Sequence, residues 1–202
     1  MIKLVVFLFV FSFTSYSLKA SDSLFFKLHF VYGSKPKRLF KHTEKKIFGG
    51  IHGGHVYTEA DNTIFSFGLD NGQWHIIAHK KKIVGKYGVD KDLIWHGDTG
   101  KLKITTIIIP ITEDQLEKFK SAEKKYLSKA PYDYAFIGMR CAAGAYDMLS
   151  ITGISKPLSR SRMVFKYFYP KKLRKRMLKR AEKEHWQVIK QEGRPTRKWE
   201  RD

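Results

Sequence analysis

Two short extended segments joined by Asp61-Asn62 constrain the fold of this chain more than any other feature. Residues 55–59 and 63–67 have the alternating, β-branched and aromatic composition of strands, and a turn at Asp-Asn between them is typical of a hairpin. Residues 24–31, 74–78 and 101–109 have a similar composition, and Pro110 ends the last of these segments. The middle of the protein is therefore predicted to be a sheet.

Helices are predicted after this sheet. Thr112 is placed to cap a helix, with Gln115 as its capping-box partner and apolar residues at helical spacing up to about residue 129. Residues 141–150 have small and apolar residues on one helical face, and Gly153 supplies a stop. Residues 170–190 form a strongly basic third candidate. This order of elements predicts an α+β fold with a small antiparallel sheet.

Three regions are predicted along the chain. Residues 1–20 have a lysine, an apolar run and then small residues, which is typical of a signal peptide and predicts export to the periplasm or the extracellular space. The apolar run is shorter than the stretch of about twenty residues that spans a bilayer. The remaining length fits one domain, predicted at residues 21–158, with a basic helical extension at 159–202.

The basic extension carries much of the charge of the chain. The formal net charge is +20, and residues 160–202 contain sixteen Lys or Arg against five Asp or Glu. Such a surface attracts nucleic acid, anionic lipid or acidic cell-wall polymer. The favoured interpretation is that Leu173, Met177 and Leu178 pack this helix against the core while its charges are solvated. The alternative is that the helix binds an anionic partner, and export makes a specific nucleic acid unsuitable, which leaves an anionic polymer or lipid surface.

Cys141 is the only cysteine, so it forms no internal disulfide. It is either a free thiol, one half of an intermolecular bridge or a buried apolar residue. Its position at the predicted start of a helix favours a nucleophile, because unpaired amides and the helix dipole stabilise a thiolate there. The backbone N–H of Cys141 is also placed to donate to an oxyanion.

His55 is the best candidate for the base that a nucleophilic thiol needs. Glycines precede it, and the strand that follows would hold its ring in place. Tyr57 and Glu59 share its strand face, so Glu59 is a candidate third member of a triad. Other histidines also stay open as the base or as a polarising residue: His52, His75 and His79.

The segment from Gly54 to Gly68, followed about seventy residues later by Tyr134 and by Arg140-Cys141-Ala-Ala, resembles the circularly permuted papain-like hydrolases. This group includes permuted NlpC-type amidases, lecithin–retinol acyltransferase-like enzymes and PPPDE-type isopeptidases. The resemblance implies a histidine that opens a strand and a cysteine that starts a helix. It assigns the base to His55 and the nucleophile to Cys141, and it matches Tyr134 to a tyrosine often found in the family.

Two positions depart from the family pattern. Arg140 stands where the family often has Asn, and a guanidinium there is suited to binding a substrate carboxylate or phosphate. Phe67 stands where some members have a second His, which leaves a Cys–His dyad as an alternative to a triad. Tyr134 and Tyr57 are further candidates for substrate binding. No metal or cofactor is expected.

The expected function is therefore that of an exported, monomeric cysteine hydrolase that cleaves an amide bond in a cell-wall peptide or another peptide-like substrate. A thioester or lipid ester is an alternative substrate, since the same acyl-enzyme chemistry serves all three. A second hypothesis is a catalytically inactive basic module that binds an anionic envelope polymer or membrane surface.

Overall fold

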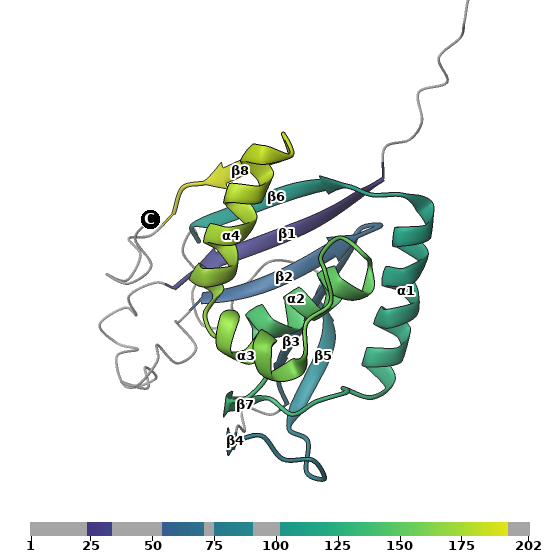
Figure 1. The fold of residues 1–202 in the computed structure, drawn as a ribbon, viewed down its shortest axis with the longest axis vertical. Coiled ribbons are helices and arrows are strands. Elements are labelled where there is room, and N and C mark those ends of the chain that lie inside the picture. The colour runs from purple at the N-terminus through teal and green to yellow at the C-terminus, as the bar shows by residue number, and fades with distance from the viewer. Residues whose placement is uncertain (1–23, 34–53, 71–74, 91–101, 194–202) are drawn as a thin grey trace, which may run out of the picture.

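The computed structural model describes residues 24–33, 54–70, 75–90 and 102–193. Its main element is a six-stranded antiparallel sheet of order β5-β3-β2-β1-β6-β8 (Figure 1). The strands of this sheet are β1 (Phe25–Tyr32), β2 (Gly54–Ala60), β3 (Thr63–Leu69), β5 (Gly85–Asp90), β6 (Ile104–Pro110) and β8 (Gln187–Gln191). The helices are α1 (Glu113–Ser128), α2 (Cys141–Ile151), α3 (Arg160–Lys166) and α4 (Pro170–Lys183). The predicted α+β class is confirmed.

The predicted hairpin is present as β2 and β3. Asp61 and Asn62 have φ values of 49° and 59°, so both turn residues adopt the left-handed conformation. A two-residue turn of this kind matches the twist of the flanking strands, and Asn and Asp tolerate it better than most residues. The strands predicted at residues 24–31 and 101–109 correspond to β1 and β6, which pair with each other.

The first two predicted helices are confirmed as α1 and α2. At the start of α1, the Thr112 hydroxyl accepts from the Gln115 backbone N–H, and the Gln115 side chain accepts from the Thr112 backbone N–H. This reciprocal pair satisfies two amides that the first helical turn leaves unpaired. Gly153, with a φ of 76°, follows α2 in the left-handed conformation, as the predicted stop requires.

The basic helix ends earlier than predicted. It stops at Lys183, and residues 187–191 form β8, which pairs with β6 at one edge of the main sheet. Ile189, expected on a helix, lies on this edge strand and is half exposed. The strand predicted at residues 74–78 is shorter, as β4 (His75–Ile77), and it pairs in parallel with β7 (Ala135–Ile137) in a separate two-stranded sheet.

The core lies between one face of the main sheet and the helices, with α2 and α4 across that face (Figure 1). Phe26, Leu28 and Phe30 alternate along β1 and are fully buried there. The opposite face carries a smaller apolar cluster of Val31, Tyr57, Leu102 and Ile104. Residues one apart in β1 and β2 therefore lie on opposite sides of the sheet.

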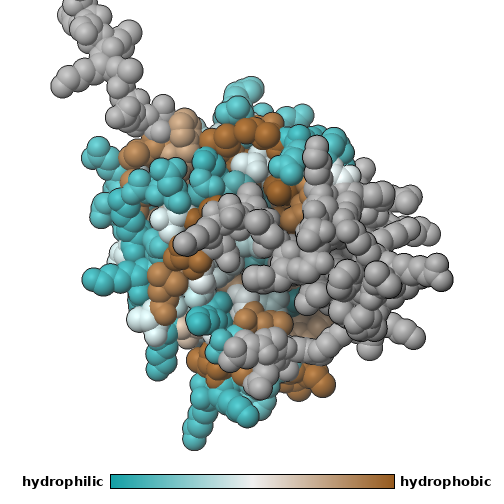
Figure 2. Space-filling view, turned by 180° about the vertical axis from the view of Figure 1, so that it is seen from behind, coloured by the Kyte–Doolittle hydropathy of each residue, from teal (hydrophilic) through white to brown (hydrophobic). Residues whose placement is uncertain are grey.

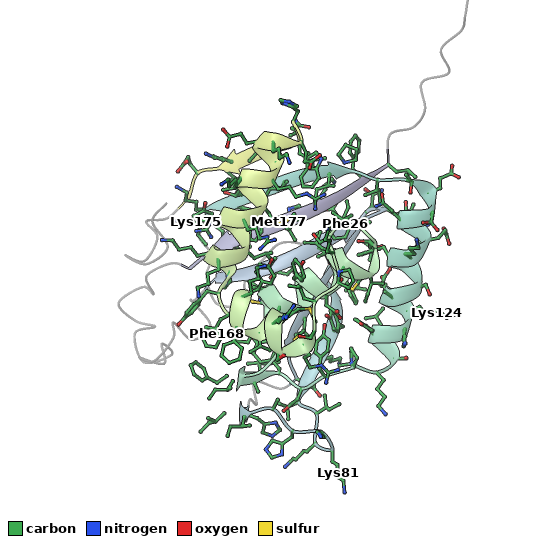
Figure 3. All side chains as sticks on the ribbon, viewed as in Figure 1. Phe26, Lys81, Lys124, Phe168, Lys175 and Met177 are labelled. Carbon is green, nitrogen blue, oxygen red and sulfur yellow. The ribbon has the colours of Figure 1, made fainter. Side chains whose placement is uncertain are left out.

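The basic helix α4 is packed against the core. Leu173 and Met177 are buried, as the predicted apolar stripe requires. Arg174 is also fully buried, and its guanidinium carbon lies 3.7 Å from the ring centroid of Tyr32. Lys175, which is labelled in Figure 3, is exposed on the outer side of this helix. Part of the positive charge of the extension is thus turned inward, where an aromatic ring stabilises it.

None of the helices in the described ranges is long and apolar enough to cross a membrane. The predicted signal peptide at residues 1–20 lies outside the described residues, as does the alternative base His52.

Candidate active site

The start of α2 meets the edge of β2 where the hairpin ladder ends. The ladder between β2 and β3 runs from Thr58 to Ala60, whereas β3 continues beside β5 as far as Leu69. Among the described strands, none pairs with this edge of β2 before Thr58, so the edge is open to another group. Gly54 begins this segment with a φ of 89°, and a Cβ there would lie 2.7 Å from the Val31 carbonyl oxygen, so a side chain would collide with β1.

The Cys141 side chain occupies this open edge. Cys141 is the first residue of α2, and its thiol sulfur accepts from the backbone N–H groups of Val56 in β2 and Ala142 in α2. Backbone amides of a strand point within the plane of the sheet. A sulfur that accepts from Val56 therefore lies at the strand edge, next to the backbone of the preceding residue, His55.

The thiol is buried, and burial dominates its ionisation. Only 4% of Cys141 is exposed, and this burial raises the pKa of the thiol. The charge of Arg140, the Val56 and Ala142 amides and the Tyr134 hydroxyl act in the opposite direction and favour the thiolate. The net direction is upward, although the helix start alone predicts a lowered pKa. The resting side chain is therefore a protonated thiol.

Tyr134 is in contact with the thiol and with the amide that follows it. Its hydroxyl donates to the Cys141 sulfur and accepts from the Cys141 backbone N–H and the Arg140 guanidinium. Burial raises the pKa of Tyr134 to about 12, with a contribution from Cys141, so the hydroxyl keeps its proton at neutral pH. The Cys141 N–H, which is the predicted oxyanion donor, thus lies beside the sulfur. In this structure it donates to the Tyr134 hydroxyl.

Arg140 is the N-cap residue of α2 and lies within an aromatic cluster. Its guanidinium carbon is 4.9 Å from the ring centroid of Phe168, 5.6 Å from Tyr169 and 5.7 Å from Phe136. Its buried Nη1 has no hydrogen-bond partner within the described part of the chain. Arg140 thus places a positive charge next to Cys141, and its guanidinium lies over three aromatic rings.

His55 is the second residue of β2 and is 6% exposed. Burial lowers the pKa of its imidazole to about 3, so the ring is neutral at any ordinary pH. The ring is 4.5 Å from that of Tyr57, centroid to centroid, on the face that also carries Val31. The Val56 side chain faces α2 from the other side. The imidazole and the thiol therefore flank the same short stretch of backbone at the strand edge.

Glu59 makes contacts other than the predicted one to His55. Its Oε1 accepts from the Lys27 ammonium, and its Oε2 is 2.9 Å from His29 Nε2. Burial lowers the pKa of His29, so a neutral ring donates to Glu59 while its Nδ1 accepts from the Thr106 hydroxyl at 2.8 Å. The structure thus brings together Cys141, Tyr134, Arg140 and the backbone beside His55, and it pairs Glu59 with other residues.

His75 and His79 lie near β7, next to a buried carboxylate. The His75 Nδ1 atom is 2.6 Å from Asp133 Oδ2, and the two histidine rings are 4.3 Å apart between centroids. The sequence patterns did not single out Asp133, although an acid between Tyr132 and Tyr134 was the available signal. Within the described residues, no group of three or more His, Cys, Asp or Glu is arranged to hold a metal ion.

Comparisons with protein-family models, with curated protein sequences and with solved structures found no match for this chain. Membership of the permuted papain-like hydrolases is therefore a proposal.

Proposed function

We propose that the protein is a cysteine hydrolase of the permuted papain-like type, which cleaves an amide bond through an acyl-enzyme on Cys141. The observation that carries the proposal is the hydrogen bond from the Val56 N–H to the Cys141 sulfur. It places the first residue of an apolar helix against the backbone that bears His55, the residue that the sequence assigns as base.

The proposed reaction starts from a neutral pair. His55 accepts the thiol proton as the sulfur attacks the substrate carbonyl, and a carbon–sulfur bond forms. The imidazolium then gives this proton to the departing nitrogen, and the carbon–nitrogen bond breaks. In the second half, His55 accepts a proton from water as the oxygen of that water attacks the thioester carbonyl and a carbon–oxygen bond forms. The carbon–sulfur bond then breaks, and the imidazolium returns the proton to the departing thiolate. The products are an amine and a carboxylic acid.

Three neighbours favour the charges that develop in this reaction. The positive charge of Arg140 stabilises the sulfur when it loses its proton, and the Val56 amide acts in the same direction. The Cys141 N–H becomes available to the oxyanion once the Tyr134 hydroxyl oxygen no longer accepts from it. Because Glu59 already binds Lys27 and His29, the proposal uses a Cys–His dyad.

The proposed substrate is a cell-wall peptide or another peptide-like amide outside the cytoplasm, and the proposed active form is a monomer. Arg140 and Tyr134 are the proposed substrate contacts, with Tyr57 beside the base. Esters and thioesters are alternative substrates for the same nucleophile.

A second function is favoured by the ionisation of the thiol. Burial holds the pKa of Cys141 above its usual value, and Arg140 is already engaged with three rings. These properties also fit a catalytically inactive fold whose basic surface binds an anionic polymer.

The two functions are separated by replacing Cys141 with Ala and following the cleavage of cell-wall peptides and of synthetic peptide amides by chromatography. The proposed hydrolase predicts that the wild-type chain releases new amines and that Cys141→Ala abolishes the release while circular dichroism is unchanged. Equal release by both chains would exclude the mechanism, and retention on an anionic polymer without any cleavage would favour the binding module.

A further inference from the structure

The small sheet of β4 and β7 exposes large apolar side chains on both of its sides. Ile76 is 66% exposed, Ile77 is 65% exposed and Ile137 is 55% exposed. Ile77 and Ile137 are register partners in the parallel pair, so their side chains lie next to each other on one side. Ile76 precedes Ile77 in the strand and points to the other side. We call these two strands the β4–β7 ribbon.

Cations follow the ribbon directly. Lys80, Lys81 and Lys82 come three to five residues after Ile77 and are exposed. Figure 3 shows Lys81 at the far end of the molecule, beyond β4, and Figure 2 shows apolar and hydrophilic surface together at that end. Neither residues 75–89 nor residues 134–146 contain an Asp or Glu. The formal charges within these two segments are therefore all positive, and the exposed Asp70 lies beside them, where its backbone N–H donates to the Val84 carbonyl at 2.9 Å.

A buried carboxylate holds this region in a fixed position. Asp133, almost fully buried, accepts from the backbone N–H groups of His79 and Val84 at 2.8 Å each. Its Oδ2 is also 2.6 Å from His75 Nδ1, at the start of β4. The Asp133 side chain therefore binds both the start of β4 and the two ends of the segment that contains the lysines, His79 and Val84. The isoleucines are presented by an anchored element rather than by a free chain end.

We propose that the β4–β7 ribbon docks on the surface of an anionic lipid bilayer. In this arrangement Ile76, Ile77 and Ile137 enter the boundary between headgroups and acyl chains, while Lys80, Lys81 and Lys82 contact the lipid phosphates. Apolar burial and attraction to anionic headgroups together hold proteins at such interfaces. The proposal concerns a surface and is independent of the hydrolase mechanism.

The exposure of both sides of the ribbon favours a bilayer over a protein partner. A second protein, or a second copy of this chain, would cover one side of a two-stranded ribbon and leave the other in water. Acyl chains surround an inserted element on every side, so Ile76 and Ile77 are buried at the same time. The lysines then match the negative charge of the leaflet, a match that a neutral apolar protein surface does not provide.

The first test is co-sedimentation of the full chain with vesicles of equal parts phosphatidylglycerol and phosphatidylcholine. The double variant Ile76→Ser/Ile77→Ser is compared with Leu127→Ser/Ile189→Ser, which replaces exposed apolar residues on α1 and β8. We expect the ribbon variant to bind at least about tenfold more weakly and the control to bind like the wild type, since apolar insertion is lost only in the ribbon variant. Equal losses in both variants would overturn the proposal.

The charge contribution is tested with Lys80→Gln/Lys81→Gln/Lys82→Gln against Lys124→Gln/Lys125→Gln/Lys129→Gln. All six lysines are exposed, and the control set lies at the end of α1, where Figure 3 labels Lys124. Each phosphate-contacting lysine is expected to contribute about fivefold to binding. Because the whole chain is strongly basic, binding that weakens equally in both sets would mean general charge attraction and would contradict the assigned surface.

A fluorescent reporter tests insertion directly. In a Cys141→Ser background, Ile77→Cys or Ile189→Cys is labelled with an environment-sensitive dye. A blue shift on addition of the vesicles is expected for residue 77 and not for residue 189. An unchanged spectrum at residue 77, or a blue shift that appears without lipid and rises with protein concentration, would overturn the proposal, the latter by showing self-association. Neither outcome depends on Cys141 being a nucleophile.

Discussion

At the scale of single residues, the proposed catalytic pair rests without charge. Burial opposes the thiolate of Cys141 and the imidazolium of His55 alike, raising the pKa of the first and lowering that of the second to about 3. A thiolate–imidazolium ion pair is therefore not the resting state. The proton has to move during the attack itself, as it does between serine and histidine in serine hydrolases. Arg140 is the group that limits the cost of the transient thiolate.

This resting state predicts a particular pH dependence of thiol alkylation. Thiolate forms only as the pH rises through a pKa that lies above the usual cysteine value, so the iodoacetamide rate rises about tenfold per pH unit through neutrality. Removing the positive charge in Arg140→Gln raises the pKa further and slows alkylation by up to about tenfold at a given pH. Mass spectrometry of the labelled chain measures both rates.

Two further variants control this experiment. Arg140→Lys keeps the charge and retains most of the rate, whereas Arg162→Gln removes an exposed cation on α3 and leaves the rate unchanged. An alkylation rate that is already constant between mildly acidic and neutral pH would contradict the neutral pair, because it would show a preformed thiolate.

The sequence predicted the positions of Cys141 and His55 in their helix and strand better than it predicted the ionisation of their side chains. Cys141 starts a helix and His55 opens a strand because capping, glycine and alternation signals are local. The raised pKa of Cys141 comes from its burial in the folded chain, where Val56, more than eighty residues earlier, is a neighbour, and local patterns do not show which groups cover a side chain. Asp133 was missed for the same reason, since its partners His75, His79 and Val84 come from a distant segment.

At the scale of elements, the position of α2 determines where the thiol lies. Phe67 of β3 is buried against this helix, and a Cβ on Gly144 would lie 2.9 Å from the Phe67 Cβ and 3.0 Å from the Tyr87 hydroxyl. Farther along α2, Asp147 accepts from the hydroxyl groups of Tyr126 at 2.9 Å and Tyr132 at 3.2 Å. Glycine thus allows the close approach of α2 to the sheet, and partly buried hydrogen bonds fix its rotation.

Gly144→Ala is therefore predicted to destabilise the protein although alanine is the better helix former. Overpacking of this kind costs about 1–3 kcal/mol, more than the gain of up to about 1 kcal/mol from helix propensity. Gly88→Ala is the matched control, because a Cβ at Gly88 meets no atom within 4 Å. Urea denaturation measures both, and equal midpoints for the two variants would contradict the close approach.

Elements with strong local signals were predictable, and those that depend on pairing were not. The hairpin and the capped helix α1 carry their own turn and cap residues. By contrast, β8 has only two apolar residues, Val188 and Ile189, and it becomes a strand because β6 offers an unpaired edge. β5 contains two glycines, which weaken a strand signal, and it forms beside β3.

At the scale of the whole molecule, the proposed lipid-docking ribbon and the proposed nucleophile lie close along the chain. Ile137 ends β7, and only Gly138, Met139 and Arg140 separate it from Cys141. Phe136 of the same strand contacts both Arg140 and Phe168. A substrate brought to the ribbon would therefore meet the start of α2 without crossing the molecule.

The most direct test of the account is acylation of Cys141 by an activated ester, p-nitrophenyl acetate, followed by intact-protein mass spectrometry. The predicted result is one transient acetyl group that maps to Cys141, is absent from Cys141→Ser, and forms about a hundredfold more slowly in His55→Gln because the general base is lost. Circular dichroism of each variant confirms that the fold is retained. An adduct at Cys141 that forms equally fast without His55, or a wild-type chain that is never acylated at Cys141, would contradict the proposed mechanism.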